Sequence, residues 1–186
     1  MKISFDVPDE YPWIVLACLV LCIEAFFASL FVVKARAAHF PNEFMKENFG
    51  KLHKETYPGE IARPLGFPDI GYGRYSDKLS YKGWIEFNNV VRSHLNIVEQ
   101  INFLLVIFMI GGLILPKLSM VLAWLGVIGR AIYIIGYVVK GANGRLFGAF
   151  FNLIPNYFTT FTVLIVLIVA SIKNAGNYFS PATPVQ

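Results

Sequence analysis

The stretch LNIVEQINFLLVIFMIGGLILPKL, residues 95–118, determines the fold class. Residues 95–115 are mostly apolar, and at about 1.5 Å rise per residue a helix of this length crosses a hydrocarbon layer of about 30 Å. Gly111-Gly112 and Pro116-Lys117 leave only a tight turn before the next apolar stretch, so the two helices are antiparallel neighbours. Similar stretches occupy residues 11–33, 118–139 and 147–172. The sequence therefore predicts an all-α integral membrane protein with a bundle of four transmembrane helices.

The composition supports this prediction. Of the 186 residues, 56% are hydrophobic and 15% are charged, and the mean hydropathy is +0.57. A soluble all-α domain would need polar helix faces that these stretches lack, and no alternation of period two indicates a β-barrel. The first stretch follows the acidic residues Asp6, Asp9 and Glu10 and has no small-residue cleavage site, so we expect a retained span rather than a signal peptide. We expect a single membrane domain over residues 1–186.

The basic residues indicate the orientation in the membrane. Ten Lys or Arg residues lie within residues 34–92, and Lys140 and Arg145 follow the third span, on the same side. By the positive-inside rule this side faces the cytosol or the mitochondrial matrix, which predicts an endoplasmic reticulum or mitochondrial membrane protein surrounded by lipid. These charges are ordinary membrane flanks, and we expect no nucleic acid partner. Cys18 and Cys22, the only cysteines, lie within the first span, so we expect neither a disulfide nor a metal site.

A long loop at residues 37–83 separates the first two spans. It is rich in proline and glycine, and we expect a short helix at residues 42–53 followed by an irregular segment. The triplet GYG at residues 71–73 is neither a phosphate loop nor a selectivity filter, because no Lys-Ser/Thr follows it and no pair of pore helices flanks it. Loops of this length are usually functional or held by a partner.

Polar residues at the mouth of the second span form a stripe. Arg92, Asn96 and Glu99 share one helix face, and Tyr133 and Tyr137 of the third span lie at corresponding distances from the short turn. Taken singly, the arginine fits a snorkelling helix end, the asparagine an interhelical hydrogen bond and the tyrosines an interfacial belt. A carboxylate inside the membrane is costly and usually marks a functional site or a paired charge. Together the five residues indicate a polar ligand with ammonium and carboxylate groups.

Three motifs carry a resemblance to a known family. FNNVVRSHLNIVEQ, residues 87–100, resembles the Arg-x-x-x-Asn-x-x-Glu helix that binds glutathione in the membrane-associated proteins of eicosanoid and glutathione metabolism, the MAPEG family. GRAIYIIGY, residues 129–137, is similar to its paired-tyrosine motif, and KAR, residues 34–36, to the basic end of its first helix. Within the family, the chain is most similar to the microsomal glutathione S-transferase 3 type. The resemblance covers the four spans but not the long loop.

The resemblance implies a glutathione transferase or peroxidase that conjugates lipophilic electrophiles or reduces lipid hydroperoxides, with glutathione as co-substrate. It also implies a homotrimer that holds glutathione between neighbouring subunits, with Arg145 as the catalytic residue that stabilises the thiolate. The chain departs from the pattern at Gln100 and Asn102, where many relatives have an aromatic residue and a proline. The implied glutathione-binding residues are Arg36, Arg92, Asn96, Glu99, Tyr133 and Tyr137.

A second reading is a non-catalytic subunit or lipid-binding protein that keeps the fold within a larger membrane complex, with the long loop and the tail, residues 174–186, as docking surfaces. Arg145 and Arg36 distinguish the two readings, because an enzyme needs a cation near the sulfur whereas an accessory subunit needs only the packing. A transporter or channel is not favoured, since the spans have no inverted repeat or broken helix.

Glu24 and Arg130 form a further expected contact, outside the family motifs. Both lie near the middle of their spans, the first and the third, at a similar depth. Because an isolated charge at this depth costs several kcal/mol, we expect a structural ion pair within hydrogen-bond reach, either in one subunit or across a subunit contact, although each could instead find its own backbone or water partner.

Overall fold

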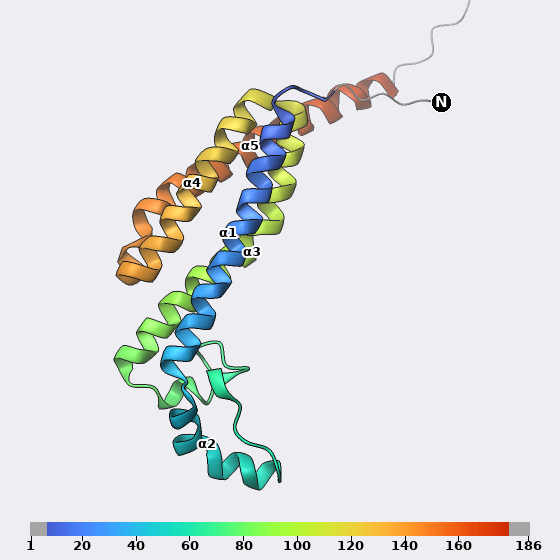
Figure 1. Ribbon diagram of the computed structural model, residues 1–186. Coiled ribbons are helices and arrows are strands. Elements are labelled where there is room, and N and C mark those ends of the chain that lie inside the picture. Colours follow the sequence, from blue (N-terminus) through green and yellow to red (C-terminus); the bar gives the residue numbers. More distant parts are fainter. Residues whose placement is uncertain (1–6, 179–186) are drawn as a thin grey trace, which may run out of the picture.

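The computed structural model describes residues 7–178, which form five α-helices and three short 3-10 helices without a β-strand (Figure 1). In chain order these are α1 (Tyr11–His39), α2 (Asn42–Thr56), η1 (Pro64–Gly66), η2 (Ser76–Lys78), α3 (Tyr81–Ile114), α4 (Pro116–Lys140), η3 (Gly141–Asn143) and α5 (Arg145–Tyr178). Four of the helices, α1, α3, α4 and α5, are long and apolar enough to cross a membrane. The predicted four-span helical fold is therefore confirmed.

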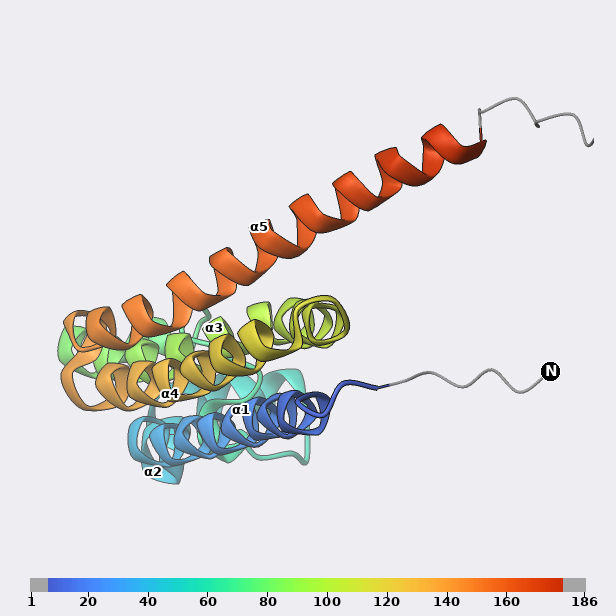
Figure 2. The same ribbon diagram turned by 90° about the horizontal axis from the view of Figure 1, so that it is seen from above.

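The four long helices pack as a bundle with an apolar core. Helices α1 and α3 run side by side along the molecule, and α4 and α5 form a closely packed antiparallel pair (Figure 1). Figure 2 shows that α5 diverges from the other helices toward its C-terminal end. The core between α1, α3 and α4 contains Ile14, Ala17, Cys18, Leu21, Leu104, Phe108, Ala123 and Val127. Outside the core, the long helices expose large apolar side chains such as Phe26 and Phe103, as expected of helices solvated by lipid.

Small residues set the spacing between α4 and α5. A Cβ atom on Gly148 of α5 would overlap the backbone of Tyr133 on α4, and one on Gly129 of α4 would lie 2.5 Å from the carbonyl carbon of Phe151. A third contact joins Gly136, near the end of α4, to the carbonyl of Gly144, just before α5. Because membrane helices associate through close packing rather than through the hydrophobic effect, these glycines explain the tight α4–α5 contact.

The ordered part of the first loop is larger than the sequence predicts. The expected short helix is present as α2 and ends at Thr56 rather than at residue 53. Helix α3 begins at Tyr81, well before the predicted start of the span at residue 95, because the Ser80 side chain caps it by accepting a hydrogen bond from the Gly83 N–H at 3.2 Å. An apolar cluster of Phe40, Met45, Phe49, Phe87 and Val91 joins α2 to α1 and α3.

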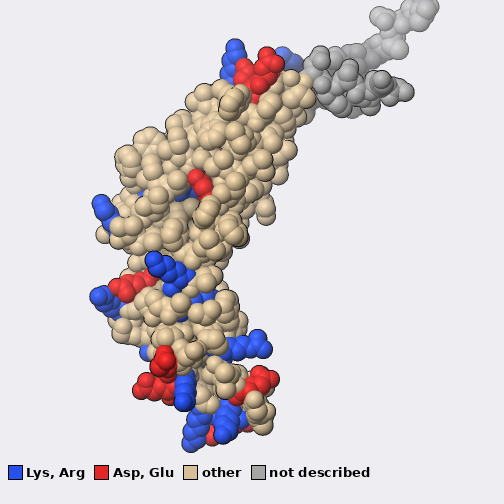
Figure 3. Space-filling model, in the orientation of Figure 1, with Lys and Arg blue, Asp and Glu red and all other residues tan. Residues whose placement is uncertain are grey.

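Charged side chains gather at one end of the molecule. Figure 3 shows most of them around α2 and the first loop, and a smaller group at the opposite end of the bundle, whereas the face between these two ends is mostly uncharged. The basic residues of the first loop thus lie where α1 and α3 meet this loop (Figure 1), and the candidate site lies next to them.

Candidate functional site

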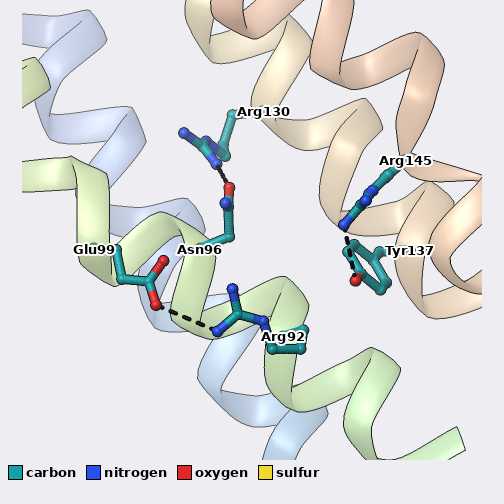
Figure 4. A network of polar contacts seen from close by, with 6 residues as sticks. All are labelled: Arg92, Asn96, Glu99, Arg130, Tyr137 and Arg145. Carbon is teal, nitrogen blue, oxygen red and sulfur yellow. Dashed lines mark hydrogen bonds and ion pairs between the residues drawn. The ribbon is translucent and has the colours of Figure 1, made fainter. Parts of the chain in front are cut away.

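The polar stripe of α3 is divided between two sets of partners (Figure 4). Arg92 Nη1 lies 3.4 Å from Glu99 Oε1, two turns further along the same helix. The two side chains remain partly exposed, at 39% and 54%. A cation and an anion are therefore held together at the edge of the bundle, where a ligand of opposite charges can reach both.

Asn96, between these two residues, faces a different partner. Arg130 of α4 is fully buried, and its Nη1 donates to Asn96 Oδ1 at 2.6 Å (Figure 4). Its Nη2 donates to Gln100 Oε1 at 2.6 Å. Gln100 is thus a polar partner that the sequence analysis missed, although its spacing of four residues from Asn96 places both amides on one helix face.

Glu24 does not form the expected direct contact with Arg130. Among residues 7–178 of the single subunit, no ion pair joins them within 4.0 Å. The two terminal nitrogens of the guanidinium donate instead to two amide oxygens on α3. Within the same range, Glu24 Oε2 and Arg130 Nε are buried without a hydrogen-bond partner. The arginine therefore links α4 to α3 rather than directly to α1.

Tyr137 and Arg145 meet where α4 ends and α5 begins. Arg145 Nη1 donates to the Tyr137 hydroxyl at 3.1 Å, and the guanidinium carbon lies 5.3 Å from the centre of the tyrosine ring (Figure 4). The contact follows from the local backbone, because Gly136 and Gly144 let the end of α4 touch the start of α5. The structure thus brings together the tyrosine and the arginine that the resemblance assigns to binding and to the thiolate.

Tyr133 lies one turn before Tyr137 and is deeper in the bundle. Its side chain is buried, and its ring centre lies 5.6 Å from that of Tyr137 in an edge-to-face arrangement. It packs with Ala28 and Ile97 of the neighbouring helices. In this subunit Tyr133 supports the ring of Tyr137.

Arg36 lies apart from the other predicted ligand residues. The side chain is only 4% exposed and donates to the backbone carbonyls of the first loop: Nη1 to Leu65 at 3.0 Å and to Gly66 at 3.2 Å, and Nη2 to Asp69. The guanidinium carbon lies 4.2 Å from the centre of the Phe67 ring. The structure therefore uses this arginine to attach the end of α1 to the loop.

A cavity of about 290 Å³ joins two of the predicted residues. Its walls include Tyr72 from the first loop, Trp84, Asn88, Asn89 and Arg92 from α3, and Tyr137 from α4. Larger cavities of about 430 and 580 Å³ contain none of the predicted ligand residues. We call the 290 Å³ cavity the Arg92–Tyr137 pocket. Tyr72 is a wall residue that the sequence analysis missed, since no periodic pattern connects the loop to α3.

Fold and site together define a multi-pass helical membrane protein with a polar pocket at the ends of its helices. The sequence model of the MAPEG family matches residues 14–172, so the chain belongs to the MAPEG family. Members of this family generally use glutathione. No curated protein matches the chain. The family resemblance is therefore confirmed, whereas assignment to the microsomal glutathione S-transferase 3 type stays a prediction.

Proposed function

We propose that the protein is a membrane-bound glutathione transferase or peroxidase that acts on lipophilic electrophiles and lipid hydroperoxides. The observation that carries the proposal is the Arg92–Tyr137 pocket, where Arg145 donates to the hydroxyl of the pocket tyrosine. Cationic donors thus converge at one end of an otherwise apolar bundle. Glutathione suits such a site, since it offers carboxylates, an ammonium group and a thiol.

The Arg92–Glu99 pair supports the binding part of this proposal. A bound tripeptide would replace the 3.4 Å contact with two stronger ones, its carboxylate accepting from the arginine and its ammonium donating to the glutamate. Asn96, Tyr133 and Tyr137 complete the proposed set of ligand residues. Arg36 would contribute only through the loop, because its guanidinium is occupied by backbone carbonyls.

Arg145 supplies the catalytic part. A free thiol has a pKa of about 8.5 and is mostly protonated at neutral pH, and a neighbouring guanidinium lowers this pKa by favouring the anion. The thiolate would then form a carbon–sulfur bond with an electrophile, either displacing its leaving group or adding to an activated double bond. With a lipid hydroperoxide it would attack the O–O bond, releasing the lipid alcohol and leaving a sulfenic acid, which a second glutathione would convert to the disulfide and water. The lipophilic substrate would arrive through the membrane, which the exposed apolar faces of the helices contact.

The proposal includes a homotrimer in an endoplasmic reticulum or mitochondrial membrane. Glutathione would then lie between subunits, so a neighbouring copy would close the open side of the Arg92–Tyr137 pocket. The alternative is a non-catalytic subunit of a larger membrane complex, which needs the bundle but not a cation beside the sulfur.

One experiment separates these functions. Glutathione is titrated into the purified protein while the ultraviolet absorbance of the thiolate is followed, and the detergent-corrected mass is measured on the same sample. The proposed enzyme gives a saturable thiolate signal and the mass of three chains. A protein that binds no glutathione and gives no thiolate signal would support the accessory-subunit reading.

A further inference from the structure

The triplet GYG at residues 71–73 places a tyrosine of the first loop beside the candidate site. Tyr72 is 63% exposed, and it lines the Arg92–Tyr137 pocket together with the two residues for which the pocket is named. It belongs neither to a span nor to any of the family motifs, and the proposed function has given it no role.

A buried carboxylate fixes the backbone on both sides of Tyr72. Asp69 is 6% exposed, and its oxygens accept hydrogen bonds from four backbone N–H groups and one hydroxyl. The donors are the N–H groups of Gly71 at 2.7 Å, Gly73 at 3.1 Å, Tyr75 at 2.9 Å and Ser76 at 2.8 Å, and the Ser76 hydroxyl at 2.6 Å. Charge-assisted bonds of this kind are stronger than neutral ones, so the turn has one well-defined shape.

The same turn is attached to α3 beside the pocket. The Gly71 carbonyl accepts from Trp84 Nε1 at 3.0 Å and from Asn88 Nδ2 at 3.2 Å, and both side chains are themselves pocket walls. Gly71 has φ of +106°, and a Cβ there would overlap the Asn88 amide, while one on Gly73 would lie 2.7 Å from Asp69 Oδ2. Only glycine fits these two positions, so the backbone on each side of Tyr72 is packed directly against its supports.

A second attachment connects the loop to α1. The guanidinium carbon of Arg36 lies 4.2 Å from the centre of the Phe67 ring and 5.6 Å from that of Phe87, and the group donates to three loop carbonyls. One of these carbonyls belongs to Asp69, the residue that organises the turn. Arg36 on α1 is therefore connected to Tyr72 through Asp69 and the adjacent Gly71.

We infer, on the basis of the proposed function, that Tyr72 is a ligand-contact residue of the glutathione pocket and that Arg36 and Asp69 are positioning residues that hold it there. The phenol of Tyr72 supplies a hydrogen-bonding wall on the loop side of the pocket, opposite the donors from α3 and α4. Arg36, the last residue of the KAR motif, therefore acts through the loop and does not contact the tripeptide.

The direct test measures glutathione binding to the full-length protein in detergent by calorimetry. Tyr72→Ala is expected to raise the dissociation constant about tenfold, and Tyr72→Phe to cause part of this loss, because one hydrogen bond and the ring contact are removed separately. The matched control is Tyr57→Ala, which removes a similarly exposed tyrosine of the same segment that lines a different cavity. This control should change the constant less than about twofold.

The outcomes separate the inference from the function on which it depends. If the parent binds glutathione and Tyr72→Ala binds equally well, Tyr72 is not a contact residue, while the proposed function stands. If the parent itself does not bind glutathione, both the proposed function and the inference are overturned.

The positioning role of Arg36 requires a double-mutant cycle. Arg36→Lys keeps the charge but cannot reach three carbonyls, so it should weaken glutathione binding several-fold in the parent and have no further effect in the Tyr72→Ala background. Equal losses in both backgrounds would mean that Arg36 touches the ligand directly, which overturns the positioning role. If Arg36→Lys does not fold, Asp69→Asn takes its place in the same cycle: a loss confined to the parent background supports positioning through the loop, and equal losses in both backgrounds overturn it.

Discussion

The α4–α5 contact and the first loop bring residues to the same pocket by different physical means. At the α4–α5 contact, glycines allow two backbones to touch, and the close approach carries Arg145 to Tyr137. In the loop, a buried carboxylate and a buried guanidinium gather backbone groups and carry Tyr72 to the pocket. The α4–α5 contact depends on the small volume of its glycines, and the loop depends on its buried charges. Each should therefore fail under a perturbation that leaves the other intact.

The largest effect is expected when volume is added to the helix contact. Gly148→Ala puts a methyl group into the backbone of Tyr133, which cannot move aside without separating α4 from α5. Overpacking of this kind costs roughly 1–3 kcal/mol, and the cost should be at the upper end here because the obstacle is main chain. Thermal unfolding in detergent measures it. Gly50→Ala in α2 is the matched control, since its Cβ would meet only the Lys46 side chain at 3.6 Å, and it should be neutral or slightly stabilising.

Removing the Arg145 guanidinium from the α4–α5 contact should reduce thiolate formation more than glutathione binding. Arg145→Ala deletes the guanidinium beside Tyr137, so the glutathione thiol should return to a pKa of about 8.5 and be only a few per cent ionised at neutral pH. The ultraviolet thiolate signal should disappear, while the dissociation constant of glutathione changes little. Lys140→Ala, which removes an exposed cation near the same end of α4, serves as the control. A full thiolate signal in Arg145→Ala would show that the arginine is wrongly assigned.

At the Arg92–Glu99 pair we expect the opposite pattern, with weaker glutathione binding and an unchanged thiolate. Glu99→Gln removes the proposed partner of the ligand ammonium, and losing a charge-assisted hydrogen bond costs on the order of 1.5–3 kcal/mol. The dissociation constant should therefore rise by at least about tenfold, which calorimetry measures, while bound glutathione still forms its thiolate. An unchanged dissociation constant would rule out this glutamate as a ligand residue.

Periodicity in the sequence explains why the helix contact was easier to predict than the loop. Tyr137 lies at the same distance from the short turn as Asn96, which shares a helix face with Arg92, and Arg145 follows a motif with a family resemblance. The partners of Arg36, in contrast, are backbone carbonyls of residues 65–69, and carbonyls leave no signal in side-chain identity. Hydropathy did not show that the helix begins before the predicted second span, because the polar residues ahead of the span already belong to α3 once Ser80 caps that helix.

The expected Glu24–Arg130 contact shows the limit of arguments from depth. Depth along two helices was a sound reason to bring the charges to one level, but it carries no information on which face each helix presents. Asn96 and Gln100 of α3 present amide oxygens to the buried guanidinium, and an uncharged acceptor satisfies an arginine without burying a second ion. A search for two amides four residues apart on one neighbouring helix would have found this partner set.

The smallest effect is expected from acid acting on the loop, and it tests the charge side of the comparison. Burial alone would raise the pKa of the Asp69 carboxyl, but the hydrogen bonds from Ser76, Gly71 and Gly73 together hold this pKa below its ordinary value. Since the folded-state pKa is depressed, the stabilisation is fully present above the unfolded value of about 3.9 and is lost as the pH falls through the folded value. Between about pH 8 and about pH 5 the loop should therefore not change, and it should open only in stronger acid.

Trp84 reports on this opening, because its indole N–H donates to the Gly71 carbonyl within the Asp69-centred turn. Its fluorescence is followed during acid titration without glutathione, in a variant with the other two tryptophans, Trp13 and Trp124, replaced by phenylalanine. Asp69→Asn should give the open-loop signal already at neutral pH and remove the acid transition, whereas Asp77→Asn, at an exposed position of the same loop, should leave the curve unchanged. An acid transition that survives in Asp69→Asn would mean that another group controls the loop, and the contrast between a charge-held loop and a volume-held helix pair would then be lost.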